Sequence, residues 1–446
     1  MSGKALRERA GRAVADPALR RALAFATDHM AVQRSQAIDR LENFEELRRS
    51  ARAVRAATLA RLPDVLATLA DRIEAAGGRV FFASDGAEAC RYVSEVARSH
   101  GARRVAKAKS MVTEEIGLNP ALAAAGLEVV ETDLGEWIVQ LTGEHPSHII
   151  APAVHLSRGQ VADVFRRHGG KGLSDEPTEL TAYARSQLRE VFLSADVGIS
   201  GCNFAVAETG TICMVTNEGN GRMVTSLPPV HIVVMGMERV VETWEHLDLV
   251  MSLLPRSATG QALTVYTTMV TGPRRAGEVD GPGELHVVIV DNGRSSILGG
   301  PYGEILQCIR CGACLNVCPV YRQVGGHTYD AAYSGPIGAV LSPLLQGGAA
   351  CDLRLASSLC GACYQACPVM IPLQDLLLGL RRDAAPRAGR PERWLWGLWS
   401  RAWSRPRVYR VTTRLADWGA RLVPSRLVPR WGKGREVPRP RREGKG

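Results

Sequence analysis

The chain has 446 residues, of which 46% are hydrophobic, 22% charged and 5% aromatic. This length predicts two or three domains with buried cores, and the composition excludes disordered, collagenous and disulfide-scaffold proteins. No run of about eighteen consecutive apolar residues occurs, which excludes a membrane-spanning helix. The start of the chain, residues 1–9, is charged and unlike a secretory signal, so the protein is expected in the cytoplasm.

The formal net charge of +10 comes from one end of the chain. From Arg381 onward there are 19 basic and 5 acidic residues, whereas residues 1–380 hold 36 basic and 40 acidic ones. The body is therefore slightly acidic, and the tail carries the whole basic excess.

Hydrophobic periodicity predicts an α/β architecture behind a helical start. Residues 1–78 are expected to be helical, because apolar residues recur at helical spacing as far as the break at Gly77-Gly78. From Arg79 onward, short apolar runs alternate with amphipathic segments, which predicts an α/β domain over 79–298 with a mostly parallel sheet covered on both faces. Strands are predicted at residues 80–83, 105–108, 127–130, 148–151, 197–200, 231–235 and 286–290.

A cysteine-rich module is predicted over residues 299–385, followed by a tail over 386–446. Eight of the 11 cysteines lie between Cys308 and Cys367, while Cys90, Cys202 and Cys213 are scattered. Such crowding in a reducing compartment favours metal ligation over disulfides.

The cysteines form two copies of one pattern. The first copy is the C-x2-C-x2-C-x3-C-P run of bacterial iron–sulfur proteins, in which closely spaced thiolates bind one cubane and the last cysteine faces a second cluster. The second copy has Ser357 at the position of the leading cysteine. The first copy is Cys308, Cys311, Cys314, Cys318 and Pro319; the second retains Cys360, Cys363, Cys367 and Pro368.

Exchange of the last cysteines predicts two neighbouring [4Fe–4S] clusters that relay single electrons. Cys308, Cys311, Cys314 and Cys367 would hold the first cluster, whereas Cys318, Cys360 and Cys363 supply three ligands to the second. The fourth ligand of this cluster would be Cys351, Ser357, water or a partner's side chain. A three-iron cluster is a further alternative. A cluster with incomplete cysteine ligation would instead bind substrate at its open iron. Cys351 lies outside the expected spacing, which favours a free cysteine. Zinc fits this doubled pattern poorly.

Several segments resemble the lactate utilisation protein B family, the iron–sulfur subunits of a three-component bacterial system that oxidises L-lactate. The resemblance implies that the seven cysteines named above are the cluster ligands, that two other subunits are partners, and that the α/β domain is similar in fold to the sugar-phosphate isomerase and CoA-transferase group. The arginine-rich tail departs from the family pattern. The segments are residues 198–211, 217–222, 271–275, 291–295, 308–319, 325–338 and 357–363.

Polar loops after strands of such a domain predict a ligand pocket. An alternative makes Glu208 and Arg222 a buried pair and the neighbouring glycines simple turns. Isolated histidines, including His155, His231 and His327, are expected to be structural. The candidate pocket residues are Glu208, Thr209, Asn217, Glu218, Asn220 and Arg222.

The tail, in which tryptophans alternate with arginines, has three interpretations. It would contact an anionic membrane surface, nucleic acid or a partner protein. Docking to a partner is favoured, because Trp and Arg are enriched in interface hot spots, and nucleic acid is disfavoured. The Pro- and Gly-rich end, 430–446, is expected to be disordered.

The predicted function is an iron–sulfur electron-transfer subunit of a complex that oxidises L-lactate to pyruvate, with the electron acceptor left open. No residues that would abstract a hydride or proton from lactate are visible, so the chain is expected to carry electrons rather than to form the catalytic centre. The alternatives are another 2-hydroxy acid substrate such as glycolate, or an enzyme acting on a CoA ester or sugar phosphate in the N-terminal domain.

Overall fold

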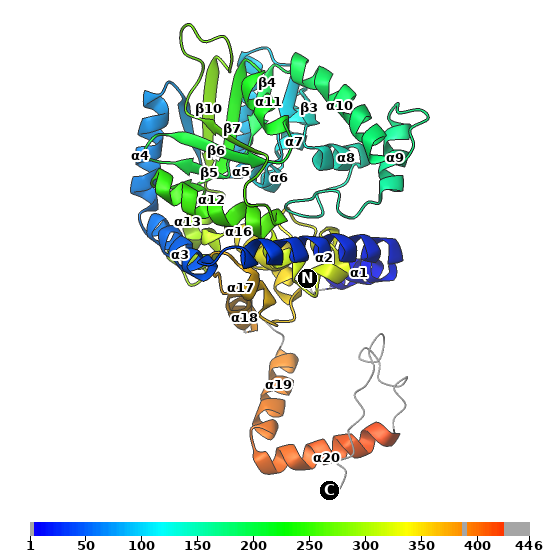
Figure 1. Cartoon of the computed structure of the whole chain (residues 1–446). Coiled ribbons are helices and arrows are strands. Elements are labelled where there is room, and N and C mark those ends of the chain that lie inside the picture. Colours follow the sequence, from blue (N-terminus) through cyan, green and yellow to red (C-terminus); the bar gives the residue numbers. More distant parts are fainter. Residues whose placement is uncertain (1–3, 386–389, 423–446) are drawn as a thin grey trace. The chain divides into compact units, whose positions relative to one another are not determined.

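The computed structural model describes residues 4–385 and 390–422, in two units that comprise residues 1–380 and 381–446 (Figure 1). In the first unit, four N-terminal helices precede a parallel sheet. Asp16 begins the long second helix, because its carboxylate accepts hydrogen bonds from the backbone N–H groups of Ala18 and Leu19. The helices are α1 (Lys4–Ala15), α2 (Pro17–Asp39), α3 (Phe44–Ala60) and α4 (Leu62–Ala75).

The main sheet has six strands in the order β1-β10-β7-β4-β2-β3, and every neighbouring pair is parallel. The predicted parallel sheet is therefore confirmed. The strands are short, and β7 and β10 within the sheet are rich in β-branched residues, as expected of strands buried on both faces. The strands are β1 (Arg79–Ala83), β2 (Arg104–Lys107), β3 (Glu128–Glu131), β4 (Val197–Ser200), β7 (Val230–Gly236) and β10 (Glu284–Val290).

Helices cover both faces of this sheet. Ile232 and Val234 of β7 join one apolar cluster with α5 and α7, whereas Val233 and Met235 join another with α4 and α12. This alternation follows from the two-residue period of a strand. The helices around the sheet are α5 (Gly86–Ser99), α6 (Met111–Glu115), α7 (Leu118–Ala124), α8 (Leu134–Thr142), α9 (Arg158–Arg167), α10 (Pro177–Ser194), α11 (Asn220–Ser226), α12 (Trp244–Thr259) and α13 (Arg294–Ile297).

Two features of this domain differ from the sequence prediction. Residues 148–151 form no strand; instead, His148 Nδ1 accepts hydrogen bonds from the backbone N–H groups of Ile150 and Ala151, which turns the chain. A second sheet, in the order β8-β5-β6-β9, was not predicted. Its strands are β5 (Phe204–Val206), β6 (Thr211–Thr216), β8 (Val240–Val241) and β9 (Tyr266–Val270).

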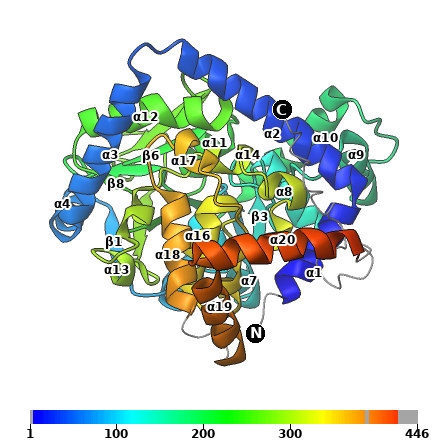
Figure 2. The same ribbon diagram turned by 90° about the horizontal axis from the view of Figure 1, so that it is seen from below.

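The cysteine module consists of short helices and lies against the N-terminal helices. Helix α2 packs on α14 and α15, and Figure 2 shows it passing beside α14. The apolar core is continuous from α3 and α4 into the module, so these parts form one unit. The elements are η1 (Gly303–Gln307), α14 (Ala313–Asn316), α15 (Tyr321–Val324), η2 (His327–Tyr329), α16 (Gly335–Gln346), η3 (Gly348–Leu355), α17 (Ala362–Ala366) and α18 (Leu373–Ala384).

The second unit contains α19 (Arg390–Trp403) and α20 (Pro406–Leu422). Aromatic rings contact one another along it: the centroids of Trp399 and Trp403 are 4.9 Å apart in a tilted pair, and those of Trp403 and Tyr409 are 5.4 Å apart in an edge-to-face pair. In the described part of the chain, no helix is both long and apolar enough to cross a bilayer. The segment predicted to be disordered, 430–446, lies outside the described residues.

Candidate iron–sulfur and ligand sites

The structure gathers the seven pattern cysteines into two groups. Burial, and then the neighbouring thiols of Cys308, Cys311 and Cys367, raise the pKa of Cys314 well above its usual value. In the second group, burial and then Cys360 raise the pKa of Cys318. Burial and then the Cys318 thiol raise the pKa of Cys363. Cys363 is also a neighbour of Cys314, so the two groups adjoin.

Burial keeps most of these thiols protonated in the absence of a metal. It raises the pKa of Cys311 to about 12, and that of Cys363 and Cys367 to about 11. Because iron binds the thiolate, cluster assembly must displace these protons.

Backbone N–H groups point at the sulfur atoms. The amides of Arg310 and Ile371 donate to Cys308 Sγ and Cys367 Sγ, each at 3.4 Å. Arg310 itself has a φ of 61°, which non-glycine residues rarely adopt. Such N–H···S bonds favour the charged thiolate and help to set the reduction potential of a bound cluster.

The described thiols are not drawn together as closely as the ligands of a single zinc ion. Four thiolates about 2.3 Å from one zinc ion would lie about 3.8 Å from one another. Among the described residues, however, no three cysteine sulfurs lie within 4.8 Å of one another. A cubane separates its ligands by its own iron atoms, so wider spacing is what it requires.

Buried arginines hold the cysteine loops in place. Arg48 Nη2 donates to the carbonyl of Cys367 at 2.8 Å, and Arg239 Nη1 donates to that of Cys308 at 2.7 Å. Arg55 contacts the carbonyls of Leu306 and Gln307 at 3.2 and 3.4 Å. These cations would stabilise an anionic cluster. Sequence analysis missed them, although Arg48 and Arg55 lie among the small and apolar residues of the helical stretch 44–60.

A buried ion network connects the first cysteine loop to the α/β domain. Glu238 contacts Arg294 at 2.7 Å and Arg310 at 3.1 Å. Burial opposes ionisation of Glu238, but Arg294, Arg310 and Arg239 hold its pKa at about 2. The guanidinium of Arg310 lies 4.3 Å from the ring centroid of Tyr333. The carboxylate is therefore charged at neutral pH and fixes the Arg310 side chain.

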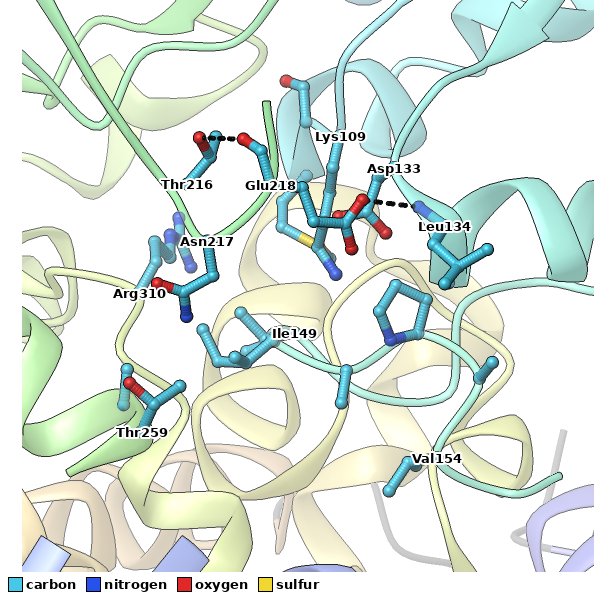
Figure 3. A pocket seen from close by; sticks show the side chains of 18 of the residues that line it. Lys109, Asp133, Leu134, Ile149, Val154, Thr216, Asn217, Glu218, Thr259 and Arg310 are labelled. Atoms are coloured by element: carbon cyan, nitrogen blue, oxygen red, sulfur yellow. Dashed lines mark hydrogen bonds between the residues drawn. The ribbon is translucent and has the colours of Figure 1, made fainter. Parts of the chain in front are cut away.

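A cavity of about 1300 Å³ lies beside this loop. Its lining is mainly apolar, but Lys109, Asp133, Asn217, Glu218 and Arg310 project into it (Figure 3). Burial, and then Asp133, raise the pKa of Glu218 to about 7, and one of its oxygens accepts a hydrogen bond from the backbone N–H of Leu134 at 3.1 Å. Glu218 is thus able to take up or release a proton near neutral pH.

Three of the six candidate pocket residues line this cavity: Asn217, Glu218 and Asn220. The other three are not among its lining residues. Glu208 accepts a hydrogen bond from the N–H of Trp244 at 2.8 Å, the hydroxyl of Thr209 lies 2.9 Å from that of Thr211, and Arg222 is exposed on α11. Neither the full predicted pocket nor the alternative buried pair of Glu208 and Arg222 is formed.

Two histidines expected to be isolated meet in space. The ring centroids of His155 and His327 are 4.4 Å apart, and His155 Nε2 lies 2.9 Å from a carboxylate oxygen of Glu144. His231 is buried, with Nε2 2.8 Å from the Ser200 hydroxyl, and burial lowers its pKa to about 3. The proximity of His155 to His327 has no signal in the sequence, because 171 residues separate them.

Comparison with known proteins agrees with this architecture. Residues 66–290 match the LUD domain model, and residues 304–371 match the 4Fe-4S dicluster domain model. The fold and the cysteine groups thus define an iron–sulfur protein with an α/β LUD domain.

Curated relatives extend the match over nearly the whole chain. It is 50% identical to lactate utilization protein B of Shouchella clausii (strain KSM-K16), over 95% of this chain and 88% of that protein. It is 55% identical to the protein of the same name in Macrococcus caseolyticus (strain JCSC5402), over 82% of this chain and 77% of that protein. It is 48% identical to the one in Bacillus thuringiensis (strain Al Hakam), over 99% of this chain and 96% of that protein. This chain belongs to the lactate utilization protein B family, which confirms the resemblance. The predicted likeness to sugar-phosphate isomerases stays a prediction, as do the domain boundaries.

Proposed function

We propose that this chain is the iron–sulfur electron-transfer subunit of a cytoplasmic system that oxidises L-lactate to pyruvate, acting with two other subunits. The curated relatives are named for lactate utilization, and this chain matches the 4Fe-4S dicluster domain model. The observation that carries the proposal is the exchange of Cys318 and Cys367 between the two cysteine repeats, which makes the two groups neighbours.

Two [4Fe–4S] clusters would supply one-electron redox chemistry here. Cys308, Cys311, Cys314 and Cys367 would hold the first cluster, and Cys318, Cys360 and Cys363 would supply thiolates to the second. In the first group Cys311 and Cys367 are buried and Cys308 and Cys314 are partly exposed, whereas in the second group Cys360 is exposed. The second cluster would therefore reach the surface at Cys360, where it would exchange electrons with a partner.

The cavity beside Arg310 would bind the organic molecule that exchanges electrons with the first cluster. Arg310 Nη1 is buried and has no hydrogen-bond partner in the described structure, although its side chain lines the cavity. Such a group favours an anion. Since Arg310 lies between Cys308 and Cys311, an anion bound there would sit close to the first cluster.

The basic tail would dock on a partner subunit. Trp394, Trp396 and Trp399 are exposed among arginines on α19, and exposed apolar surface of this kind marks contact sites. Deleting residues 386–446 should abolish co-purification with the partners while leaving the iron content unchanged. Loss of vesicle binding without loss of the partners would instead indicate a peripheral membrane contact.

The central test is anaerobic purification of the chain with iron and sulfide analysis, followed by addition of the two partners and L-lactate. About eight iron atoms per chain, and clusters reduced by lactate, are expected. Reduction by glycolate alone would assign another 2-hydroxy acid. Acyl-transfer activity that survives removal of the clusters would favour a CoA-ester enzyme, and a colourless chain that binds zinc would overturn the proposal.

A further inference from the structure

The two cysteine repeats have the same backbone conformation, although only one of them begins with cysteine. Arg310 and Leu359, which precede the second cysteine position of each repeat, have φ values of 61° and 57°. The glycines two residues later, Gly312 and Gly361, have φ values of 74° and 81°. Both repeats then enter a short helix, α14 or α17. Because non-glycine residues seldom adopt positive φ, this agreement indicates a shared cluster-binding turn.

The hydrogen bond at the start of each turn is also the same. In the first repeat the N–H of Arg310 donates to Cys308 Sγ at 3.4 Å, and in the second the N–H of Leu359 donates to Ser357 Oγ at 3.1 Å. Both bonds run from residue i+2 back to the side chain of residue i. The Ser357 hydroxyl therefore occupies the position that the Cys308 thiol occupies in the first turn.

The other candidate in this chain, Cys351, lies outside the turn. It belongs to η3, and its carbonyl accepts a hydrogen bond from Arg354 within the same helix. Cys318, Cys360 and Cys363 already account for three corners of the second cluster. The remaining ligand position of the second cluster corresponds to the position of Cys308 in the first repeat.

We propose that Ser357 Oγ is the fourth ligand of the second cluster, which gives that cluster one oxygen-ligated iron. This inference rests on the proposed function, because it requires both clusters to form. On binding, an Fe–O bond forms, the Ser357 O–H bond breaks, and the proton passes to solvent, which reaches this half-exposed side chain. The iron keeps its oxidation state in this step. Since an alkoxide is a harder ligand than a thiolate, it favours ferric iron and lowers the reduction potential of the second cluster.

The experiment compares the full chain with its Ser357→Cys, Ser357→Ala and Cys351→Ala variants, all loaded with ⁵⁷Fe under anaerobic conditions. Mössbauer spectroscopy should find one distinct iron site among about eight in the unmodified chain. Ser357→Ala should lose about one iron per chain and show the EPR signal of an oxidised three-iron cluster. Ser357→Cys should keep all its iron, lose the distinct site and titrate at a higher potential. Cys351→Ala should match the unmodified chain.

Several outcomes would overturn the assignment. A Ser357→Ala chain with unchanged iron content and spectra would exclude the serine, and a three-iron cluster in Cys351→Ala would transfer the role to that cysteine. Broadening of the second cluster's EPR signal in ¹⁷O-labelled water would assign a water ligand. A chain that binds no iron at all would contradict the proposed function instead, since this result appears before any variant is compared.

Discussion

The parallel sheet and the cysteine module share one apolar core, yet different interactions hold them in shape. All seven residues of β7 are buried, and the strand pairs with β10 along its whole length and with β4 from Val230 to Val233, so burial and backbone hydrogen bonds stabilise the sheet. In the module, α14, α15 and α17 have only four or five residues each, and positive-φ turns precede the cysteines. Helices this short are not stable by themselves. The module therefore depends on its ligands and on the arginines around it.

Removing the iron should produce the largest difference in stability between the parallel sheet and the cysteine module. Once a chelator has stripped the clusters, the raised pKa values favour thiol over thiolate, and the short helices lose the contacts that fix them. We expect amide protection in residues 303–371 to fall by about 100-fold or more, while β7 and β10 change by less than about threefold. Hydrogen exchange with mass spectrometry measures both regions in one sample. Equal loss of protection in both would show that the sheet also depends on iron, and reconstitution provides the control.

Arg55 joins the cysteine module to the second sheet of the α/β domain, and its removal should have the next largest effect. Its guanidinium donates to Val240 O at 2.6 Å in the second sheet and to Leu306 O at 3.2 Å in η1. Burial, and then Arg239, lower its pKa to about 9, so it remains charged at neutral pH. Arg55→Met should lower the free energy of unfolding by about 3 kcal/mol, because buried carbonyls lose their donor.

Arg61→Met is the matched control for this substitution. Arg61 is the single residue between α3 and α4 and is exposed, and within the described part of the chain its one ion pair is with Glu242, at 3.2 Å. Its loss should cost less than about 0.5 kcal/mol. Anaerobic urea titration followed by circular dichroism measures both variants, and equal midpoints would show that Arg55 does not stabilise the junction.

Gly326 marks a second junction, where the loop before η2 crosses the loop that contains Ser147. A Cβ at Gly326 would lie 1.8 Å from the Ser147 carbonyl oxygen, which also accepts a hydrogen bond from the Tyr321 hydroxyl at 2.7 Å. Gly326→Ala should therefore destabilise the chain by about 2 kcal/mol. Gly159→Ala, in α9 with no atom within 4 Å of the added Cβ, should be neutral or slightly stabilising. Thermal unfolding gives the melting temperature of each variant. Indistinguishable melting temperatures would contradict a close approach of the two loops at Gly326.

The contrast between the regions also explains what the sequence could predict. Strand β7 and the first cysteine repeat were predictable, because hydrophobic runs and ligand spacing are local patterns. The contacts of Arg55 connect residues about 250 positions apart along the chain, and no pattern in helix α3 records them. Likewise Glu208 and Glu218 follow neighbouring strands, but only the tertiary fold directs Glu218 into the cavity and Glu208 to the start of α12.

The smallest predicted effect is a change in how the stability of the α/β domain depends on pH. Glu136 is buried in α8, with Lys109 Nζ at 3.4 Å; burial, despite Lys109, raises its pKa to about 7. Between pH 4.5 and 7 the folded state holds a proton that the unfolded state releases, so stability is greatest below this window and falls as pH rises through it. Glu136→Gln should remove about 1–2 kcal/mol of this decline, whereas exposed Glu190→Gln should leave it unchanged. Hydrogen exchange of the α8 peptides at pH 5.5 and 7.5, corrected for intrinsic rates, measures the difference. An unchanged decline in Glu136→Gln would mean that the carboxyl group is already ionised at pH 5.5, with Lys109 outweighing the effect of burial.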